Sequence, residues 1–190
     1  MKGMLSGLLL LMVNFSAFAG YDIVQVDEVK QNGKSIVQEV FYYACEHCKE
    51  IESKVLDWKK NLNNNTIVEK IPVILSDKQY MAAKHYYAAV YLNVEEEFSI
   101  NYFNEISNNK EISDSLAKSI LINLGEKSEK IEAAFNSHWV GEKIEEAKKI
   151  TLKLKVAAVP VFLVNNKYLL KRSDYKNDDE LFLELSELVK

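Results

Sequence analysis

The two cysteines of the sequence, Cys45 and Cys48, constrain the fold most, because the residues on either side predict a strand-to-helix junction. The preceding segment 35–43 is dense in β-branched and aromatic residues, which favours a buried strand. The following segment 49–62 carries apolar residues close to helical spacing. Cys45 is therefore expected near a helix N-terminus, where unpaired backbone amides and the helix dipole stabilise a thiolate.

The middle of the chain predicts one more strand and then a block of helices. The strand is expected over 66–75, with Pro72 near a sheet edge or a bulge. Ser76 and Asp77 form a plausible helix N-cap, and residues 77–141 show helical periodicity without a strand. Three or four helices are expected there, with breaks near Asn93, Asn108, Asn109, Gly125 and Gly141.

The last part of the chain returns to the strand pattern. A charged amphipathic helix is expected over 142–155. The apolar runs 156–164 and 167–170 flank the turn signal Asn165-Asn166 and predict a β-hairpin. An acidic helix that contains Leu181, Leu183, Leu185 and Leu188 closes the chain. The order of elements predicts an α/β sheet domain with a helical insertion.

Residues 1–19 have the pattern of a secretory signal peptide. Lys2 supplies a positive start, residues 3–13 are apolar, and the small residues Ala17 and Ala19 form a cleavage site, so cleavage is expected after Ala19. The apolar stretch is shorter than the roughly 20 residues needed to cross a bilayer. The mature protein is therefore expected outside the cytoplasm, where disulfides persist. The formal charge of −4 excludes the strongly basic balance of a general nucleic-acid binder.

A C-x-x-C pair can be a redox dithiol or half of a metal site. The redox interpretation makes Cys45 the exposed nucleophile and Cys48 the more buried thiol that resolves a mixed disulfide, with His47 stabilising the Cys45 thiolate. Structural zinc commonly takes four ligands, but there is no second cysteine pair. His85 and His138, expected at the surface or its boundary, lack metal-ligand spacing. The alternative from another class is a periplasmic chaperone that holds copper or zinc through Cys45, Cys48 and a histidine.

Three features together resemble the DsbA family of periplasmic thiol:disulfide oxidoreductases. They are the segment 41–48 (FYYACEHC), the helical insertion, and Val159-Pro160 before a strand. The resemblance implies a thioredoxin fold with an inserted α-helical domain, and donation of a disulfide to unfolded exported proteins that carry free thiols. It also implies reoxidation by a DsbB-like membrane quinone reductase. The thioredoxin-like domain then comprises residues 20–76 and 142–190, and the helical insertion comprises residues 77–141.

The resemblance also carries roles to individual residues. His47 occupies the family's histidine position. Pro160 is expected to be a cis proline that faces the active site and leaves the Val159 backbone free to pair with an extended substrate. Glu39 and Lys70 resemble a buried acid and base pair beneath the motif. The alternative for these two is a solvent-facing strand residue and a surface lysine.

Glu46 departs from the family pattern, because the best-known members carry proline there. A carboxylate suits the first turn of a helix, but its charge also opposes a thiolate on Cys45. Glu46 is therefore expected to tune the site without overturning its chemistry. No cofactor beyond the Cys45–Cys48 disulfide, no metal and no nucleic-acid partner is expected, and the protein is expected to be a monomer. A reductase or isomerase of the same fold is the second enzyme interpretation, although the short segment before the first strand leaves no room for a dimerisation domain.

Overall fold

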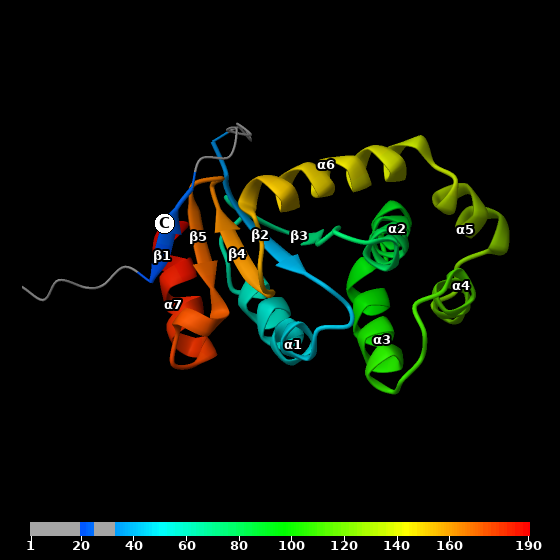
Figure 1. The fold of residues 1–190 in the computed structure, drawn as a ribbon, viewed down its shortest axis with the longest axis horizontal. Helices are drawn as coiled ribbons and strands as arrows, with labels where there is room; N and C mark the ends of the chain where they lie inside the picture. The colour runs from blue at the N-terminus through cyan, green and yellow to red at the C-terminus, as the bar shows by residue number, and fades with distance from the viewer. Residues whose placement is uncertain (1–19, 25–32) are drawn as a thin grey trace, which may run out of the picture.

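The chain forms one mixed sheet with helices on both faces (Figure 1). The computed structural model describes residues 20–24 and 33–190, so the signal peptide expected over residues 1–19 lies outside the described residues. In the described part, five strands follow the order β1-β5-β4-β2-β3. β2 and β3 are parallel, and the other neighbouring strands are antiparallel. The strands are β1 Tyr21–Ile23, β2 Ser35–Phe41, β3 Thr66–Pro72, β4 Val161–Val164 and β5 Tyr168–Lys171.

Alternate residues of the central strands bury two different helix layers, as the pleat of a strand requires. Phe162, Val164 and Leu170 belong to the core cluster formed with α1 and α7. Val161 and Leu163 belong to the larger cluster that includes the remaining helices. The helices are α1 Glu46–Lys60, α2 Asp77–Tyr91, α3 Glu95–Ser107, α4 Asp114–Asn123, α5 Ser128–Phe135, α6 His138–Leu154 and α7 Asp178–Leu188, with a 3₁₀ turn η1 at Arg172–Asp174.

The helical block between the two halves of the sheet matches the sequence prediction except at its end. Ser76 caps α2 through a hydrogen bond from the amide of Gln79, and α2 to α5 are helices separated by turns. The break expected at Gly141 is wrong, because Gly141 lies inside α6. A single glycine costs a helix about 1 kcal/mol, and the buried side chains of Val140 and Ile144 on either side of it hold the helix together. The expected boundary between residues 141 and 142 therefore falls within one continuous helix, which crosses from the insertion to the sheet (Figure 1).

The C-terminal hairpin is confirmed, although its first strand is shorter than expected. Asn165 and Asn166 adopt φ of 51° and 56°, the left-handed conformation that a tight hairpin turn requires. The Asn165 side chain also accepts a hydrogen bond from the Ile36 amide at 2.8 Å, which ties the turn to β2. Residues 156–160 form a loop instead of a strand. No sequence signal indicated β1, which is only three residues long and pairs with β5.

His85 is fully buried, which corrects the expectation of a surface or boundary histidine. Its Nδ1 lies 2.7 Å from the Tyr102 hydroxyl and its Nε2 lies 2.8 Å from a carboxylate oxygen of Asp114. These contacts join α2, α3 and α4. Burial lowers the pKa of His85, although the Asp114 carboxylate acts in the opposite direction. His85 therefore lies on α2, where it helps to pack the insertion, and its hydrogen-bond partners are on α3 and α4 and not on α1.

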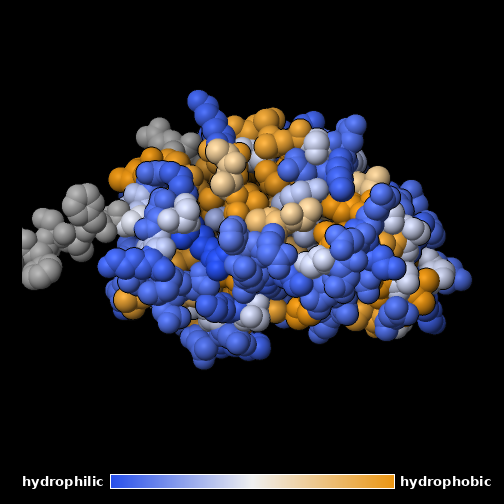
Figure 2. Space-filling view, turned by 60° about the horizontal axis from the view of Figure 1, so that its bottom comes forward, coloured by the Kyte–Doolittle hydropathy of each residue, from blue (hydrophilic) through white to orange (hydrophobic). Residues whose placement is uncertain are grey.

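Apolar surface is distributed unevenly over the molecule. On the face shown in Figure 2, apolar patches are interspersed with hydrophilic side chains. Large apolar residues that are exposed include Ile23, Leu75, Leu152 and Leu183. Among the described residues, no helix combines the length and the apolar character needed to cross a membrane.

Candidate redox site

Cys45 and Cys48 lie at the first turn of α1, where the strand-to-helix junction was expected. Cys45 is the N-cap residue, and its Sγ accepts a hydrogen bond from the Cys48 amide at 3.3 Å. Cys45 is partly exposed, whereas Cys48 is completely buried. Both are free thiols, so the structure represents the dithiol form of the pair.

The two thiols differ strongly in acidity. The pKa of Cys45 is lowered to about 6, first by the hydrogen bond from the Cys48 side chain and then, against the effect of burial, by the Cys48 amide and the charge of His47. Burial raises the pKa of Cys48 far above its usual range, and the neighbouring Cys45 raises it further. At neutral pH the dithiol therefore carries its thiolate on the exposed sulfur, which is the better position for a nucleophile or a leaving group.

The Val159–Pro160 peptide bond is cis, as expected, and the loop that contains it contacts Cys45. The Cys45 Sγ lies 3.4 Å from the carbonyl oxygen of Val159, to which the thiol donates. A groove of about 920 Å³ opens beside this contact, and its lining includes His47, Val159 and Pro160. The apolar part of the lining also includes Val24, Leu154, Val156, Val161 and Leu169.

A buried charge cluster lies beneath the motif, so Glu39 and Lys70 are not surface residues. Glu39 is completely buried, and the Lys70 Nζ lies 3.5 Å from its Oε2. Lys70 also forms an ion pair with Glu52 of α1, whose side chain is 6% exposed. Burial raises the pKa of Glu39 to about 7, although the attraction of Lys70 acts against it. Burial acts to lower the pKa of Lys70, but the two carboxylates outweigh it and raise the pKa.

Glu52 is a member of this cluster that the sequence analysis missed. Its signal was its position in α1, because Cys48, Ile51, Glu52 and Val55 are the buried residues of the helix and share one face. A glutamate on the apolar face of a helix is rarely buried without a partner. Lys70, on the neighbouring strand β3, is that partner.

The residues between the cysteines point away from the buried cluster. The His47 side chain is 72% exposed, and its Nδ1 lies 3.1 Å from a carboxylate oxygen of Glu50. The Glu46 carboxylate accepts a hydrogen bond from the Ser107 hydroxyl at 3.4 Å, which connects the motif to the end of α3. No group of three or more metal-ligating side chains is assembled within residues 20–24 and 33–190.

Comparisons with known proteins point to one family. No family model matches the chain. The chain is 29% identical over 138 residues to "Thiol:disulfide interchange protein DsbA" of Burkholderia cepacia, which covers 72% of this chain and 65% of that protein. It is 26% identical over 155 residues to the protein of the same name from Pseudomonas aeruginosa, covering 79% of this chain and 74% of that one. The match thus spans just under two thirds of the Burkholderia protein.

Solved structures agree on the fold. The crystal structure of Pseudomonas aeruginosa DsbA superposes with a TM-score of 0.80 at 24% identity and covers 89% of this chain and 89% of that chain. The oxidoreductase NmDsbA1 from N. meningitidis superposes with a TM-score of 0.75 at 16% identity, covering 90% and 91%. The thioredoxin fold with helices inserted, expected from the sequence, is confirmed by these likenesses.

Proposed function

Because the chain belongs to the DsbA family of thioredoxin-like oxidoreductases, we propose that it is a periplasmic dithiol oxidase that donates a disulfide to exported, unfolded proteins. The observation that carries this proposal is the difference in acidity between Cys45, with a pKa of about 6, and the buried Cys48. A thiolate stabilised in the dithiol form makes the corresponding disulfide easier to reduce, and hence a stronger oxidant. Export through the signal peptide over residues 1–19, with cleavage after Ala19, is part of the proposal.

The proposed reaction has two exchange steps. A substrate thiolate attacks the Cys45 sulfur of the Cys45–Cys48 disulfide, a mixed disulfide forms at Cys45, and Cys48 leaves with the electron pair. The second substrate thiolate then attacks the substrate sulfur of the mixed disulfide and releases Cys45 as a thiolate. The substrate loses two electrons and two protons, and the enzyme keeps the electrons as a dithiol. The low pKa of Cys45 makes it the favoured leaving group in the second step.

The buried cluster gives the first step its proton. Cys48 leaves as a thiolate in a site where burial strongly favours the neutral thiol. Glu39, with a pKa of about 7, holds a proton in much of the population near neutral pH and is electrostatically coupled to both cysteines. Lys70 lowers the pKa of Glu39 and Glu52 raises it, so these two effects oppose each other and the pKa, raised mainly by burial, stays near 7. We assign the cluster the role of proton donor to Cys48 on reduction and of proton acceptor on reoxidation.

The groove beside Val159 and Pro160 is the proposed substrate site. The Val159 carbonyl lies at the Cys45 sulfur, so an extended peptide that pairs with this loop brings its own sulfur to Cys45. Unfolded chains offer both the free backbone and the apolar side chains that such a groove accepts. For turnover, the dithiol passes its two electrons to a DsbB-like membrane quinone reductase. No further cofactor takes part, and the protein acts as a monomer.

Equilibration with glutathione tests the direction of electron flow. We expect the Cys45–Cys48 couple of the protein purified from the periplasm to have a reduction potential well above about −270 mV, the value of cytosolic thioredoxin. The same preparation is expected to oxidise a reduced, unfolded protein that contains two thiols. A potential near that of thioredoxin would identify a reductase instead. A stoichiometric copper or zinc ion that is lost in Cys45→Ser would identify the metal-chaperone alternative.

Glu46→Pro is expected to make the protein more oxidising. A charge at about 7 Å from the Cys45 sulfur, in an effective dielectric of about 40, opposes the thiolate by about 1 kcal/mol, which corresponds to roughly 20 mV for a two-electron couple. Substitution removes this repulsion and the contact with Ser107. The reduction potential of the variant measures the change, and Ser107→Ala is the control that breaks the contact but keeps the charge. An unchanged or lower potential in Glu46→Pro contradicts this explanation.

A further inference from the structure

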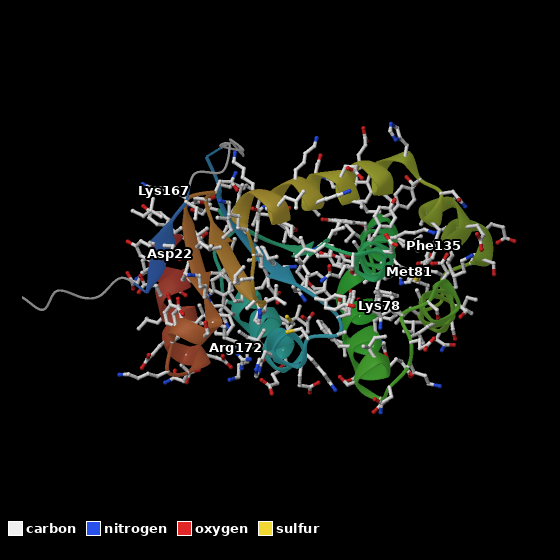
Figure 3. All side chains as sticks on the ribbon, viewed as in Figure 1. Asp22, Lys78, Met81, Phe135, Lys167 and Arg172 are labelled. Atoms are coloured by element: carbon white, nitrogen blue, oxygen red, sulfur yellow. The ribbon has the colours of Figure 1, made fainter. Side chains whose placement is uncertain are left out.

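Arg172 joins three elements at the side of the molecule where α7 approaches α1 (Figure 3). It begins η1, directly after β5, and lies 125 positions along the chain from His47, which it contacts. Its Nε and Nη2 donate to the two carboxylate oxygens of Asp178, the first residue of α7, at 2.7 and 3.2 Å. Its Nη1 donates to the main-chain oxygen of His47 at 3.1 Å and to Glu50 at 3.0 Å.

The planar guanidinium of Arg172 donates hydrogen bonds in two directions, to Asp178 on one side and to the first turn of α1 on the other. The two bonds to Asp178 fix the plane of the group, because a bidentate pair leaves it no freedom to rotate. Asp178 is itself 8% exposed and is held from a second side by Lys54 at 2.8 Å. The third nitrogen is therefore aimed at the first turn of α1 from a fixed base. A lysine at position 172 has one nitrogen and cannot hold both sides in this way.

We propose that Arg172 is a positioning residue of the Cys45–Cys48 site, which fixes the first turn of α1, together with the His47 imidazole, against the start of α7. The His47 carbonyl that Arg172 holds belongs to the same turn as the Cys48 amide that donates to the Cys45 Sγ. The Glu50 carboxylate accepts from Arg172 and contacts the His47 ring, so one cation sets both the main chain and the side chain of His47. Arg172 thus acts on Cys45 through α1 without touching the sulfur.

The pKa shifts of Glu50 and Cys45 are consistent with this arrangement. The pKa of Glu50 is lowered, first by the contact with His47 and then by Arg172, so the carboxylate stays ionised beside both groups. The amide of Cys48 and the charge of His47 are both among the causes of the low pKa of Cys45. A looser first turn of α1 weakens both the hydrogen bond from the Cys48 amide and the effect of the His47 charge, and each of these lowers the pKa of Cys45. The pKa of Cys45 then rises, and the disulfide becomes a weaker oxidant.

Arg172→Met is the direct test. We expect the pKa of Cys45, followed by thiolate absorbance in the reduced protein, to rise. We expect the equilibrium constant with glutathione to move about threefold toward the protein disulfide, the size expected for a partly exposed ionic contact, which is about 14 mV at roughly 30 mV per tenfold change. Arg172→Lys is expected to recover only part of both changes. If Arg172→Met does not fold, Arg172→Lys alone carries the test, because its ammonium still pairs with Asp178.

Lys54→Met is the matched control. Lys54 lies on α1 and donates to Asp178 Oδ2, an oxygen that Arg172 also contacts, whereas the bonds to the His47 carbonyl and to Glu50 come from Arg172. The control is expected to lower the stability to unfolding and to change the pKa of Cys45 and the glutathione equilibrium clearly less than Arg172→Met does, because Arg172 keeps its own two bonds to Asp178. A wild-type Cys45 pKa in Arg172→Met, or equal changes in the two variants, overturns the proposal and leaves Arg172 a purely structural residue.

The inference rests on the proposed function only in giving the pair a redox role. The Cys45 pKa is measured on the reduced protein without substrate or partner. A reductase-like potential in the unaltered protein would contradict the oxidase proposal while leaving the comparison of Arg172→Met with Lys54→Met intact.

Discussion

Cys48→Ala is expected to trap a stable mixed disulfide at Cys45. The Cys45 thiolate of the variant attacks oxidised glutathione, and glutathione leaves as a thiolate. Cys45 and Cys48 are the only cysteines of the chain, so no other thiol of the protein can displace the adduct. Oxidation of a dithiol substrate is expected to fall by at least about a thousandfold, because the variant cannot form the Cys45–Cys48 disulfide that the parent donates. A thiol held beside Cys45 has an effective concentration that free glutathione does not reach.

Mass spectrometry of the intact variant measures the adduct, and Cys45→Ser is the matched control. Cys48 is completely buried and burial raises its pKa, so the control is expected to take up no glutathione in the folded state. Cys48→Ala also removes the hydrogen bond that contributes most to the low pKa of Cys45. Below pH 8 the variant therefore carries less Cys45 thiolate than the reduced parent. Its adduct is expected to form more slowly than Cys45 of the reduced parent reacts with oxidised glutathione. An adduct in Cys45→Ser and none in Cys48→Ala would reverse the two roles.

The parts of the site that the sequence predicted are those set by neighbouring residues. Cys45 is the N-cap of α1 because a β-branched run ends just before it and an amphipathic pattern begins just after it. The Asn165-Asn166 turn followed from the tolerance of asparagine for positive φ. Such local signals act over a few residues and can be read without knowing what the chain packs against.

The parts that were missed depend on contacts between distant residues. Glu52 belongs to the charge cluster only because Lys70 lies beside it on β3. Arg172 and His47 are separated by 125 positions, and nothing in the sequence near either one indicates the other. At Gly141 the sequence predicted a helix break that does not occur, because the packing of Val140 and Ile144 outweighs the local effect of glycine. In all three cases, Glu52, Arg172 and Gly141, contacts between distant parts of the chain set the structure, and the local sequence does not show these contacts.

Glu39→Gln is expected to stabilise the folded protein above pH 7. Glu39 is completely buried, and neither of its carboxylate oxygens has a hydrogen-bond partner among the described residues. Lys70 lies 3.5 Å away but is also paired with Glu52. An ionised carboxylate in such a site is costly, and a neutral amide of similar shape avoids that cost.

The pH dependence follows from the raised pKa of Glu39. In the unfolded chain the pKa has its ordinary value of 4.5, and in the folded protein it is about 7. Between these values the folded state binds the proton more tightly, so stability that is fully present below pH 4.5 is lost as the pH rises through 7. The difference corresponds to about 3 kcal/mol for one group. Glu39→Gln removes this loss, so its advantage over the parent is expected to be small at pH 4.5 and to reach about 3 kcal/mol near pH 8.

Urea unfolding of the two reduced proteins across this pH range measures the difference, and titrating groups that are not coupled to Glu39, such as His85, cancel in the comparison. Glu69→Gln makes the same chemical change on β3, at a side chain that is half-buried and hydrogen-bonded to Gln38, and it is expected to show no such pH-dependent gain. Parallel curves for Glu39→Gln and the parent would mean that Glu39 does not change protonation in this range on folding. The proposed proton exchange with Cys48 would then lack its donor, because Lys70 remains charged in its pair with Glu52.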